Sequence, residues 1–509
     1  MLDSTCFRIG LLGALRSKSL GGRVVGLMVT ASHNPEPDNG VKMVDAHGEM
    51  LAAAWEPACT RVANAASADE LMEQLQAIVA EFQIVLKQPA RVVYGRDTRP
   101  SSPRLAGAIA AGLAAMGAEA IDAGLLTTPQ LHYLVLAHNT QHDEHPAGVP
   151  TADGYYAKFA GAYAEIMRGG PRAPAVLVDC ANGVGAQALQ GCLNKLPAGL
   201  LDAVPVRAAM MQPGALNNSC GADFVKTHQS LPDGYEHEAG VAPGRLLCSF
   251  DGDADRIVFY YLTGPAAQPE SFHLLDGDKI ASLLADYLSE LVREAQLDTE
   301  LQLGCVQTAY ANGAATEYLQ SRVPVAITKT GVKHLHHEAE RFDIGVYFEA
   351  NGHGTVLFSP RAIVAFDVAE SSDSDKAKAA ARRLRALALL INQSVGDALS
   401  DLLAVLVVLA ARGWGPEQWD ECYTDLPNRL LKVQVADRTQ FQTFDAERRL
   451  AAPQGLQAQI DELVSKVPRG RAFVRPSGTE DCVRVYAEAA KPAAAEKLAA
   501  DVAKVAESV

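Results

Sequence analysis

The stretch VVGLMVTASHNPEPDNGVK, residues 24–42, joins an apolar run to a polar loop. The run Val24–Val29 predicts a buried strand, and the Asn-Pro pair that follows predicts a turn. This arrangement would present the hydroxyl of Ser32, beside the imidazole of His33, at the end of a strand. The loop is either the site of a nucleophilic or phosphate-carrying serine or an ordinary strand end, and other parts of the sequence must decide.

The length and composition of the chain are those of a globular protein with several domains. It has 509 residues, of which 48% are hydrophobic and 21% charged, so three or four domains are expected. The net charge of −15 argues against general binding of nucleic acid or anionic membranes, although a local basic cluster could still hold a small anion.

The cysteines and apolar runs favour a cytoplasmic location. The nine cysteines include no CxxC pair, which argues against a zinc site and fits a reducing compartment. The longest apolar run, residues 402–411, is too short to span a bilayer and predicts a buried helix. Arg8 and Arg16 bracket an apolar segment that has no cleavage pattern, so no secretory signal is expected.

Strand and helix patterns alternate along most of the chain. This alternation predicts an α/β fold with mixed sheets and helices on both of their faces. Four domains are expected, at residues 1–170, 171–272, 273–425 and 426–509. The first three share a βα pattern, and the smaller fourth domain is expected to be α+β.

Three aspartates alternate with small residues in DGDADR, residues 251–256, between two apolar strands. Asp251, Asp253 and Asp255 can turn their oxygens toward one hard cation, and Mg²⁺ prefers such ligands. Clustered carboxylates between buried strands also repel one another unless a positive group lies among them. The sequence therefore predicts a Mg²⁺ site in this loop.

Two alternatives for the aspartate loop can be weighed from sequence. A calcium-binding EF-hand requires Gly and Glu at its sixth and twelfth positions, where this chain has Arg256 and Leu262, so that possibility is excluded. An Asp-x-Asp pair after an apolar strand also resembles the nucleophile motif of haloacid-dehalogenase-type phosphatases. In that case Asp251 would be the nucleophile and Asp253 the general acid.

Two further loops carry groups suited to a phosphosugar. EANGHG, residues 349–354, offers a carboxylate, an amide and an imidazole for sugar hydroxyls and proton transfer, although it is equally compatible with a strand-ending turn. RPSGTE, residues 475–480, with Arg484 after it, can surround a tetrahedral anion with guanidinium, hydroxyl and backbone N–H groups.

Together the four loops supply a serine, a metal site, a sugar-binding group and a phosphate-binding group. Phosphoryl transfer on a phosphosugar needs all of them. Because they come from different parts of the chain, a cleft between domains is expected to bring them together.

The same stretches closely resemble the α-D-phosphohexomutases, over essentially the whole chain from about Cys6. The motifs that carry the resemblance are TASHNPEPDNGVK (30–42), GRDTRP (95–100), NSCGADFVK (218–226), SFDGDADR (249–256), TKTGVKHLHH (328–337), YFEANGHG (347–354) and RPSGTED (475–481). The EANGH and TKTGVKHLHH forms are similar to those of the family branch that acts on N-acetylglucosamine phosphates.

The resemblance implies a fold and a reaction. The fold would be a four-domain α/β architecture around a central cleft, with three βα mixed-sheet domains and a smaller C-terminal α+β domain. The reaction would interconvert N-acetylglucosamine 6-phosphate and N-acetylglucosamine 1-phosphate, which supplies UDP-N-acetylglucosamine synthesis. It would pass through a phosphoserine enzyme and a sugar 1,6-bisphosphate, which acts as intermediate and activator.

The family's site residues carry over to the matching positions of this chain. One Mg²⁺ would be bound by the phosphoryl group on Ser32 and by Asp251, Asp253 and Asp255. The sugar and its phosphate would be bound by residues of the two later loops: Glu349, Ala350, Asn351, Arg475, Pro476, Ser477, Gly478, Thr479 and Arg484. Basic side chains would transfer protons and stabilise charge, and the sequence does not rank the candidates. They are His33, Lys42, Arg256 and His353, with Lys333 and His336 as further candidates.

One departure from the family pattern concerns the start of the chain. The family normally begins with a strand and a Gly-Thr-Ala/Ser-Gly-x-Arg segment whose arginine reaches the active site, whereas this sequence starts beyond it. The first domain is therefore expected to lack one edge strand and one catalytic arginine.

Other functions stay open at this point. A mutase for glucose or mannose phosphates, a weakly active phosphosugar-binding protein and the Asp251 phosphatase are the alternatives. A small phosphosugar is the expected partner, without nucleic acid, membrane or an obligatory protein partner.

Overall fold

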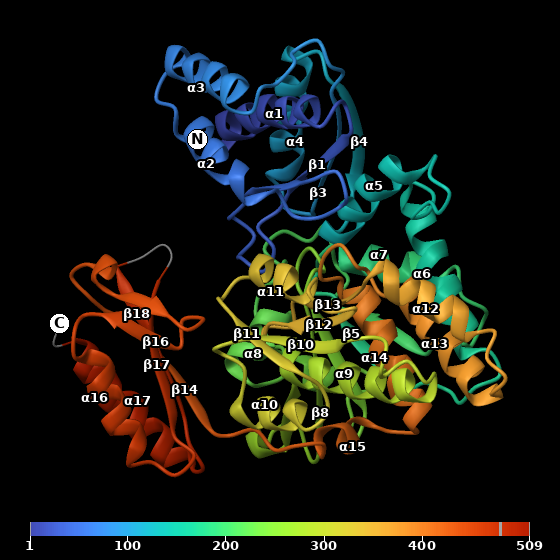
Figure 1. The fold of residues 1–509 in the computed structure, drawn as a ribbon, viewed down its shortest axis with the longest axis vertical. Helices are drawn as coiled ribbons and strands as arrows, with labels where there is room; N and C mark the ends of the chain where they lie inside the picture. Colours follow the sequence, from blue (N-terminus) through green and yellow to red (C-terminus); the bar gives the residue numbers. More distant parts are fainter. Residues whose placement is uncertain (1, 478–480, 508–509) are drawn as a thin grey trace. The chain divides into compact units, whose positions relative to one another are not determined.

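The computed structural model describes residues 2–477 and 481–507, and the chain falls into two compact units. Unit 1 comprises Met1–Asp276, Asn351–Thr355 and Arg385–Pro416, and unit 2 comprises Gly277–Ala350, Val356–Leu384 and Glu417–Val509. Figure 1 follows the chain by colour through both units. The two units are described separately below.

The helices, in chain order, are α1 (Leu2–Ser19), α2 (Glu56–Asn64), α3 (Ala68–Glu81), α4 (Ser102–Ala115), α5 (Thr128–Thr140), α6 (Ala152–Met167), α7 (Gly185–Leu193), α8 (Ala222–His228), α9 (Gly277–Glu294), α10 (Gly313–Gln320), α11 (Val332–Ala339), α12 (Pro360–Ala369), α13 (Asp375–Leu390), α14 (Ala398–Arg412), α15 (Pro416–Asp420), α16 (Leu456–Ser465) and α17 (Pro492–Glu507). No helix of the described residues is both long enough and apolar enough to cross a membrane.

Unit 1 opens with a four-stranded sheet in the order β2-β1-β3-β4. Its strands are β1 (Val24–Val29), β2 (Val41–Val44), β3 (Arg91–Arg96) and β4 (Glu119–Leu125). Strand β3 runs parallel to β1 and β4, whereas β2 returns antiparallel to β1. The strand expected at residues 24–29 is confirmed, and its end delivers the chain into the Ser32 loop.

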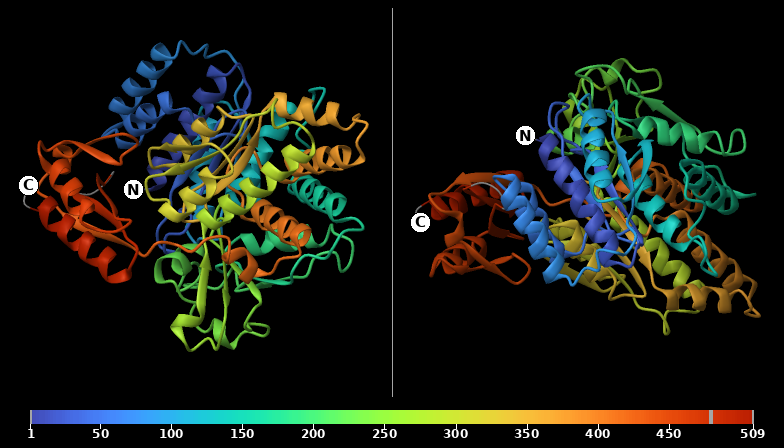
Figure 2. Two further views of the ribbon diagram at one scale, coloured as in Figure 1. Left: turned by 60° about the horizontal axis from the view of Figure 1, so that its bottom comes forward. Right: turned by 90° about the horizontal axis from the view of Figure 1, so that it is seen from above.

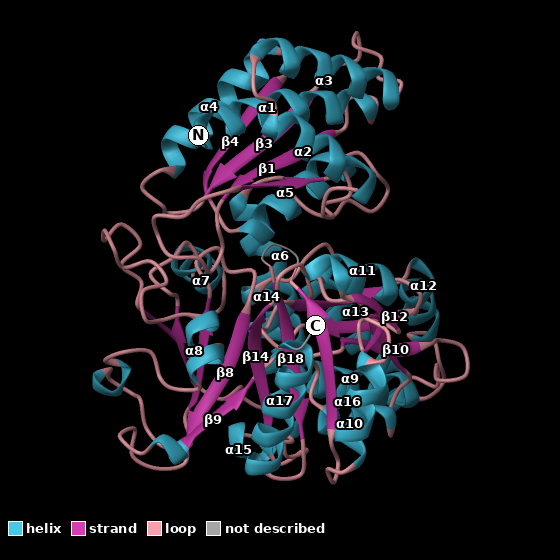
Figure 3. Ribbon diagram, turned by 90° about the vertical axis from the view of Figure 1, so that its left-hand side faces the viewer, coloured by secondary structure: helices cyan, strands magenta, loops and turns pink. Residues whose placement is uncertain are grey.

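Helices cover both faces of this sheet, with α1 and α4 on one face and α5 on the other (Figure 3). Successive residues of β1 point to opposite faces, as strand geometry requires. A Cβ on Gly26 would lie 2.8 Å from Val135 of α5, whereas the side chain of Leu27 packs against Gly13 of α1. A glycine at position 26 therefore allows α5 to approach the strand that carries the Ser32 loop.

The second sheet of unit 1 has five strands in the order β6-β5-β7-β8-β9. Its strands are β5 (Val176–Asp179), β6 (Ala203–Val206), β7 (Leu246–Phe250), β8 (Ile257–Leu262) and β9 (Phe272–Leu275). β5, β6 and β7 are parallel, and β8 is antiparallel to both β7 and β9. The aspartate loop connects β7 to β8 as expected, and the sheet continues to Leu275, beyond the expected domain limit at residue 272.

The apolar run 402–411 lies in α14, whose residues 398–410 are all buried, so the prediction of a buried helix is confirmed. The helix begins at Asp397, whose carboxylate accepts hydrogen bonds from the N–H groups of Leu399 and Ser400. The same carboxylate accepts the hydroxyl of Tyr155 in α6. These contacts place residues 385–416 in unit 1, although their position in the sequence suggests the third domain.

Unit 2 contains a four-stranded sheet in the order β11-β10-β12-β13. Its strands are β10 (Leu303–Thr308), β11 (Val325–Thr328), β12 (Ile344–Phe348) and β13 (Gly354–Phe358). β10 is parallel to both β11 and β12. The sugar loop expected at residues 349–354 connects β12 to β13.

The C-terminal part of unit 2 is an antiparallel sheet in the order β14-β18-β17, with α16 and α17 along one face (Figures 1 and 2). Its strands, with a separate hairpin of β15 and β16, are β14 (Asn428–Gln434), β15 (Gln442–Phe444), β16 (Arg449–Ala452), β17 (Arg471–Pro476) and β18 (Cys482–Glu488). Mixed sheets covered by helices, followed by this α+β segment, confirm the expected fold class.

Candidate active site

Ser32 lies just beyond the end of β1 and is almost fully buried, with 7% of its surface exposed. Its backbone adopts a left-handed conformation with φ of +52°, which is uncommon for a residue other than glycine and needs support from its surroundings. Thr30 gives local support, because its Oγ1 accepts the Ser32 N–H at 3.0 Å and donates to Asp97 at 2.8 Å. Asp97 directly follows β3, so the GRDTRP motif braces the serine loop.

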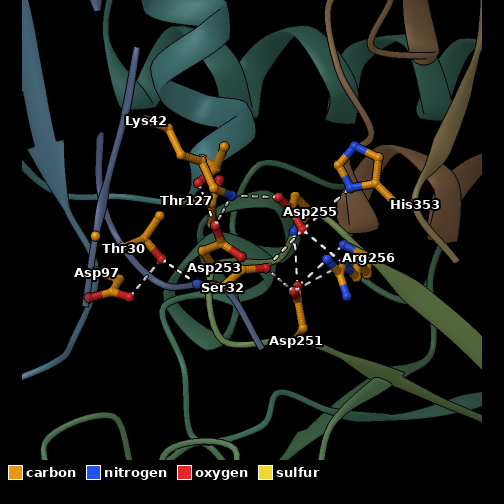
Figure 4. Close-up of polar contacts among 12 residues, drawn as sticks. Thr30, Ser32, Lys42, Asp97, Thr127, Asp251, Asp253, Asp255, Arg256 and His353 are labelled. Carbon is orange, nitrogen blue, oxygen red and sulfur yellow. Dashed lines mark hydrogen bonds and ion pairs between the residues drawn. The ribbon is translucent and has the colours of Figure 1, made fainter. Parts of the chain in front are cut away.

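The Ser32 hydroxyl lies against the aspartate loop between β7 and β8 (Figure 4). The Ser32 Oγ donates to Asp251 Oδ2 at 2.7 Å and lies 3.4 Å from Asp255 Oδ1. Asp251, Asp253 and Asp255 are each at most 3% exposed, and one oxygen from each lies within 4.8 Å of the others. The expected proximity of serine and aspartates is therefore present within unit 1.

Lys42, on β2, bridges two of these carboxylates. Its Nζ lies 2.8 Å from Asp253 Oδ2 and 2.8 Å from Asp255 Oδ2. Burial lowers the pKa of Lys42, but the two carboxylates outweigh that effect and raise it. The ammonium group is thus held among the aspartates and beside the serine.

The aspartates themselves are electrostatically unequal. Burial and the other two carboxylates raise the pKa of Asp251 well above its usual range. Burial also favours the neutral form of Asp255, but Lys42 and His353 hold the pKa of Asp255 well below its usual range.

The aspartate cluster fits a divalent cation. Asp253 Oδ1 is buried and has no hydrogen-bond partner among the described residues, although a buried carboxylate oxygen normally has one. Oxygen ligands from three carboxylates on one short loop are also the chemistry that Mg²⁺ selects. The residues present therefore suit the ion that the sequence predicts.

The contacts of Asp251 disfavour a phosphatase that uses it as nucleophile. Its Oδ1 accepts the N–H groups of Asp255 and Arg256 at 3.1 and 3.2 Å, and its Oδ2 accepts the Ser32 hydroxyl. A carboxyl whose two oxygens both accept hydrogen bonds is a weak nucleophile. The serine hydroxyl is the better candidate to carry a phosphoryl group.

Two of the predicted basic residues flank Asp255. Arg256 Nε lies 3.7 Å from Asp255 Oδ1 and 3.9 Å from Asp251 Oδ2. His353 Nδ1 lies 3.5 Å from Asp255 Oδ1, and its buried Nε2 has no hydrogen-bond partner in the described part of the chain. Both side chains are therefore close to the serine and the aspartates.

His33 faces a different group. Its Nε2 lies 3.9 Å from Asp223 Oδ1 on α8, and burial together with the charge of Arg256 lowers its pKa. Of the two reserve residues, His336 is buried in unit 2, where its Nδ1 lies 3.0 Å from the Tyr347 hydroxyl. That contact indicates a packing role for His336.

Thr128 is a site residue that sequence reasoning missed. Its hydroxyl donates to Asp253 Oδ2 at 2.6 Å, and its N–H donates to the backbone oxygen of Asp253. Thr127 caps α5 through a reciprocal pair of hydrogen bonds with Gln130, so the helix begins against the aspartate loop. The Thr-Pro-Gln pattern could have predicted the helix start, but not which loop it contacts.

The EANGHG loop is divided between the two units. Glu349 and Ala350 belong to unit 2, whereas Asn351 and His353 belong to unit 1, where Asn351 Oδ1 accepts the His353 N–H at 3.0 Å. Gly352 has φ of +86°, and a Cβ there would lie 1.9 Å from the backbone oxygen of Ile257. Glycine is therefore required where this loop meets the start of β8.

The phosphate loop follows β17 in unit 2. Arg475 Nε pairs with Glu447 Oε2 at 2.8 Å, and the Ser477 N–H donates to the Cys482 carbonyl after Pro476 ends the strand. Gly478 and Thr479, also expected to bind phosphate, lie outside the described residues.

A row of basic residues crosses the sheet beside this loop. Arg475 of β17 is directly opposite Arg484 of β18, which is directly opposite Lys432 of β14. Directly opposed residues on neighbouring strands share a face. The row therefore places Lys432, which sequence reasoning missed, on the same face as Arg475 and Arg484.

Comparison with protein families gives four successive matches. Residues 145–258 and 276–414 match the models described as "Phosphoacetylglucosamine mutase AMG1", domains II and III. Residues 19–70 and 60–145 match "Phosphoglucomutase/phosphomannomutase, alpha/beta/alpha domain I", and residues 430–505 match the C-terminal domain of the same group. A phosphoacetylglucosamine mutase of Sus scrofa is 50% identical over 507 residues, covering 98% of this chain and 90% of that protein. The chain belongs to the phosphoacetylglucosamine mutase family.

Other members of the family agree with this assignment. "Phosphoacetylglucosamine mutase 1" of Schizosaccharomyces pombe is 48% identical, covering 98% of this chain and 94% of that protein. A solved structure of Aspergillus fumigatus N-acetylphosphoglucosamine mutase has a TM-score of 0.95 and 47% identity, covering 100% of this chain and 92% of that one.

Ligands are named for two further structures of this fungal enzyme. One, at a TM-score of 0.94 and 47% identity, is a complex with GlcNAc-6P and magnesium that covers 99% of this chain and 93% of that one. The other, at a TM-score of 0.93 and 47% identity, is a complex of a variant with glucose 1,6-bisphosphate and covers 100% and 93%.

Proposed function

We propose that this protein is an isomerase that interconverts N-acetylglucosamine 6-phosphate and N-acetylglucosamine 1-phosphate by way of a phosphoserine at Ser32. The observation that carries the proposal is the buried Ser32 Oγ, 2.7 Å from Asp251 Oδ2 in the cluster of three aspartates. Membership in the mutase family and the fungal complex with GlcNAc-6P and magnesium support the substrate. The alternative of a mutase for glucose or mannose phosphates has less support.

The aspartates and the phosphoryl group on Ser32 would hold one Mg²⁺. When bound, the ion would withdraw negative charge from the phosphoryl group and so lower the barrier to attack. The unpartnered Asp253 Oδ1 and the pairing of Asp251 with Ser32 support this ligand set. Ser32, Asp251, Asp253 and Asp255 are therefore the proposed metal ligands.

Transfer forward begins with the phosphoryl group on Ser32. The O1 hydroxyl of N-acetylglucosamine 6-phosphate attacks phosphorus, the O1–P bond forms, and the bond from phosphorus to Ser32 Oγ breaks. The O1 proton passes to a basic side chain near Asp255, for which His353 is the candidate by position, and Ser32 Oγ takes up a proton as it leaves phosphorus. Arg256 and the Lys42 ammonium stabilise the charge that develops.

The resulting 1,6-bisphosphate turns in the site and returns its 6-phosphoryl group to Ser32, which leaves N-acetylglucosamine 1-phosphate. A binding site for the phosphate that is not reacting must accept either end of the sugar. We assign it to Arg475, Pro476, Ser477, Gly478, Thr479 and Arg484, with Glu349, Ala350 and Asn351 binding the ring. We also propose that the product supplies UDP-N-acetylglucosamine synthesis in the cytoplasm, and that His33 supports the loop rather than acting as a base for Ser32.

The test is a mass measurement joined to a substitution. Intact mass and peptide mapping of purified protein incubated with glucose 1,6-bisphosphate should place one phosphate on Ser32. The Ser32→Ala variant should lose both that phosphate and mutase turnover, whereas a phosphatase that uses Asp251 would keep its hydrolytic activity. Mutase turnover retained in Ser32→Ala would refute the proposed mechanism.

A substrate comparison tests the branch assignment. Turnover of N-acetylglucosamine 6-phosphate should exceed that of glucose 6-phosphate under the same conditions. Equal or faster turnover of glucose 6-phosphate would favour the phosphoglucomutase alternative. Ligand-induced thermal stabilisation without turnover of either sugar would identify a binding protein.

A further inference from the structure

The backbone carbonyls of Ser32 and Asn34 are each held by the same two side chains. Arg99 Nη2 donates to Ser32 O at 3.1 Å and to Asn34 O at 2.7 Å. Asn217 Nδ2 donates to the same two oxygens, at 2.9 and 3.0 Å. The serine loop is therefore clamped from two directions by one guanidinium and one amide.

The two donors come from different domains of unit 1. Arg99 follows β3 of the first sheet, is fully buried and pairs with Asp97, so it belongs to the same domain as the serine. Asn217 lies in the segment between β6 and α8, beside the second sheet. Its N–H donates to the Ala181 carbonyl at 3.0 Å, which anchors it to the loop that follows β5.

Asn217 also lies against the aspartate loop. A Cβ on Gly252, between Asp251 and Asp253, would come within 2.7 Å of Ser32 O and 2.8 Å of Asn217 Nδ2. The serine loop, the aspartate loop and the Asn217 amide are thus packed together without room for one methyl group. A side chain in this place connects the phosphoryl-carrying residue to the domain that carries the carboxylates.

The backbone of Ser32 needs this kind of restraint. A non-glycine residue at φ of +52° occupies a sparsely populated conformation and persists when its surroundings hold it there. Two charged or polar donors on its carbonyl fix the peptide plane and therefore the direction of Cβ and Oγ. Loss of either donor would allow the hydroxyl to leave its 2.7 Å contact with Asp251.

We propose that Asn217 is a positioning residue for phosphoryl transfer, which holds the Ser32 loop against the aspartate loop through its side-chain amide. This inference rests on the proposed function of Ser32 and adds a residue to it. Because Asn217 acts on the geometry of the serine, its removal should slow the transfer step and leave substrate binding nearly unchanged. A misplacement of about 1 Å can lower a rate by about 10²-fold.

Two substitutions remove the side-chain amide of Asn217 without straining its backbone. Asn217 has φ of +54°, a conformation that Asp and Gly both tolerate. Asn217→Asp keeps the shape of the side chain but replaces the donor by an acceptor, and Asn217→Gly removes the side chain. Each should lower kcat by about 10- to 100-fold while KM for N-acetylglucosamine 6-phosphate changes by less than about twofold.

The neighbouring residue provides a matched control. Asn218 is exposed, and its Nδ2 donates to the Gly214 carbonyl within the same loop at 3.0 Å. Asn218→Asp adds the same charge one position away and removes a donor of the same kind. It should leave kcat and KM within about twofold of the original protein, since its partner is not part of the serine loop.

A second readout follows the serine itself. Protein carrying phosphate on Ser32 should transfer it to N-acetylglucosamine 6-phosphate in a single turnover more slowly in Asn217→Asp than in Asn218→Asp, by the same factor as kcat. Equal rates in the two variants would overturn the proposal, as would a rise in KM with kcat unchanged. Loss of cooperative thermal unfolding in both Asn217 variants would also overturn it, because that result would assign Asn217 to the stability of the fold.

The Ser32→Ala variant separates this inference from the function on which it rests. If Ser32→Ala retains mutase turnover, the phosphoserine mechanism fails whatever Asn217 does. If Ser32→Ala is inactive and the Asn217 and Asn218 variants behave alike, the mechanism stands and the positioning role fails.

Discussion

The Ser32 site of unit 1 and the Arg475 site of unit 2 both concentrate charge, but with opposite sign and different burial. Around Ser32, three carboxylates that are at most 3% exposed lie against Lys42 and Arg256. Around Arg475, whose side chain is 22% exposed, basic residues of three strands stand in register and Glu447 pairs with the arginine.

The difference teaches what each site is built to accept. An excess of buried carboxylates favours a cation, and a row of partly exposed basic side chains favours an anion. Burial adds a second contrast. Removing one partner of a buried ion pair strongly destabilises the fold, because it leaves an unpaired charge away from water, whereas breaking an exposed pair costs little. Substitutions at the first site should therefore affect catalysis and stability, and those at the second should affect substrate affinity.

Removal of one aspartate should have the largest effect. Asp253→Ala deletes one proposed Mg²⁺ ligand and one partner of Lys42, so kcat should fall by at least about 10³-fold, since a metal ion contributes several kcal/mol of charge stabilisation. Steady-state turnover and a calorimetric Mg²⁺ titration check this. Asp202→Ala, at an exposed position of the same domain, is the control, and equal Mg²⁺ affinity in the two variants would contradict the metal assignment.

Replacing one ion-paired arginine in each site should change the free energy of unfolding by different amounts. Arg99→Met leaves the fully buried Asp97 without its guanidinium and should lower the free energy of unfolding of the first domain by about 3–5 kcal/mol. Arg475→Met breaks a partly exposed pair and should cost about 1 kcal/mol or less. Hydrogen exchange of the peptide amides in β1 and in β17 measures each region by itself, and similar losses of protection would contradict the contrast.

Arg475→Met should instead act on substrate affinity. A hydrogen bond to a charged group contributes about 1.5–3 kcal/mol, so KM for N-acetylglucosamine 6-phosphate should rise by about 10- to 100-fold. Steady-state kinetics over a range of salt concentrations should also show that KM of the original protein rises with ionic strength. Arg429→Met, at an exposed arginine of β14, is the control, and an unchanged KM in Arg475→Met would remove Arg475 from the phosphate site.

Glu447→Gln should have the smallest effect, and it should lower KM where Arg475→Met raises it. Glu447 Oε2 accepts the Thr330 N–H at 2.9 Å besides pairing with Arg475, so it competes with a substrate phosphate for the arginine. Loss of its charge should lower KM by about two- to fivefold, as expected for an ion pair of less than about 1 kcal/mol. Glu462→Gln, in an exposed pair with Lys466, is the control, and a higher KM in Glu447→Gln would mean that Glu447 orients Arg475 for binding.

The pH dependence of the ion pair between Glu447 and Arg475 follows from the pKa shift of Glu447. Burial raises the pKa of Glu447, but the Thr330 N–H and Arg475 outweigh it and hold the pKa below its usual range. A lowered pKa in the folded state means that the pair contributes stability above about pH 4.3 and loses it as the pH falls further. The ratio of KM between Glu447→Gln and the original protein should therefore stay constant from pH 8 to pH 5.

The sequence predicts elements best where an apolar run ends abruptly. β1 has the expected bounds, and β7 and β8 lie on either side of the aspartate loop as expected, because each is a continuous buried run that polar loops terminate. Helix α1 was not predicted, because the residues of its second half are buried almost without interruption and give no helical alternation of apolar and polar positions.

Some residues of the candidate site could likewise be predicted from the sequence and others could not. Ser32 and the aspartates were predicted from local patterns that carry their chemistry, and the structure brings them together. Asn217 and Thr128 could not be found in this way, because each acts through a contact with a distant loop; Asn217 is 185 residues from Ser32 along the chain. A lone asparagine or threonine has no local pattern that indicates such a contact.

The division of the chain into units has a consequence for synthesis on the ribosome. The chain passes between the units after Asp276, Ala350, Thr355, Leu384 and Pro416, so unit 1 includes α14 and the segment that carries His353. Domains generally fold as their residues emerge from the ribosome. Here the first two sheets can form early, but Asp255 lacks its neighbours His353 and Gly396 until both have emerged, when more than three quarters of the 509 residues have been made. Until then Ser32 and its aspartates lack at least one of these neighbours, and a nascent chain stalled before that point would carry the phosphoryl-accepting residue in an unfinished site.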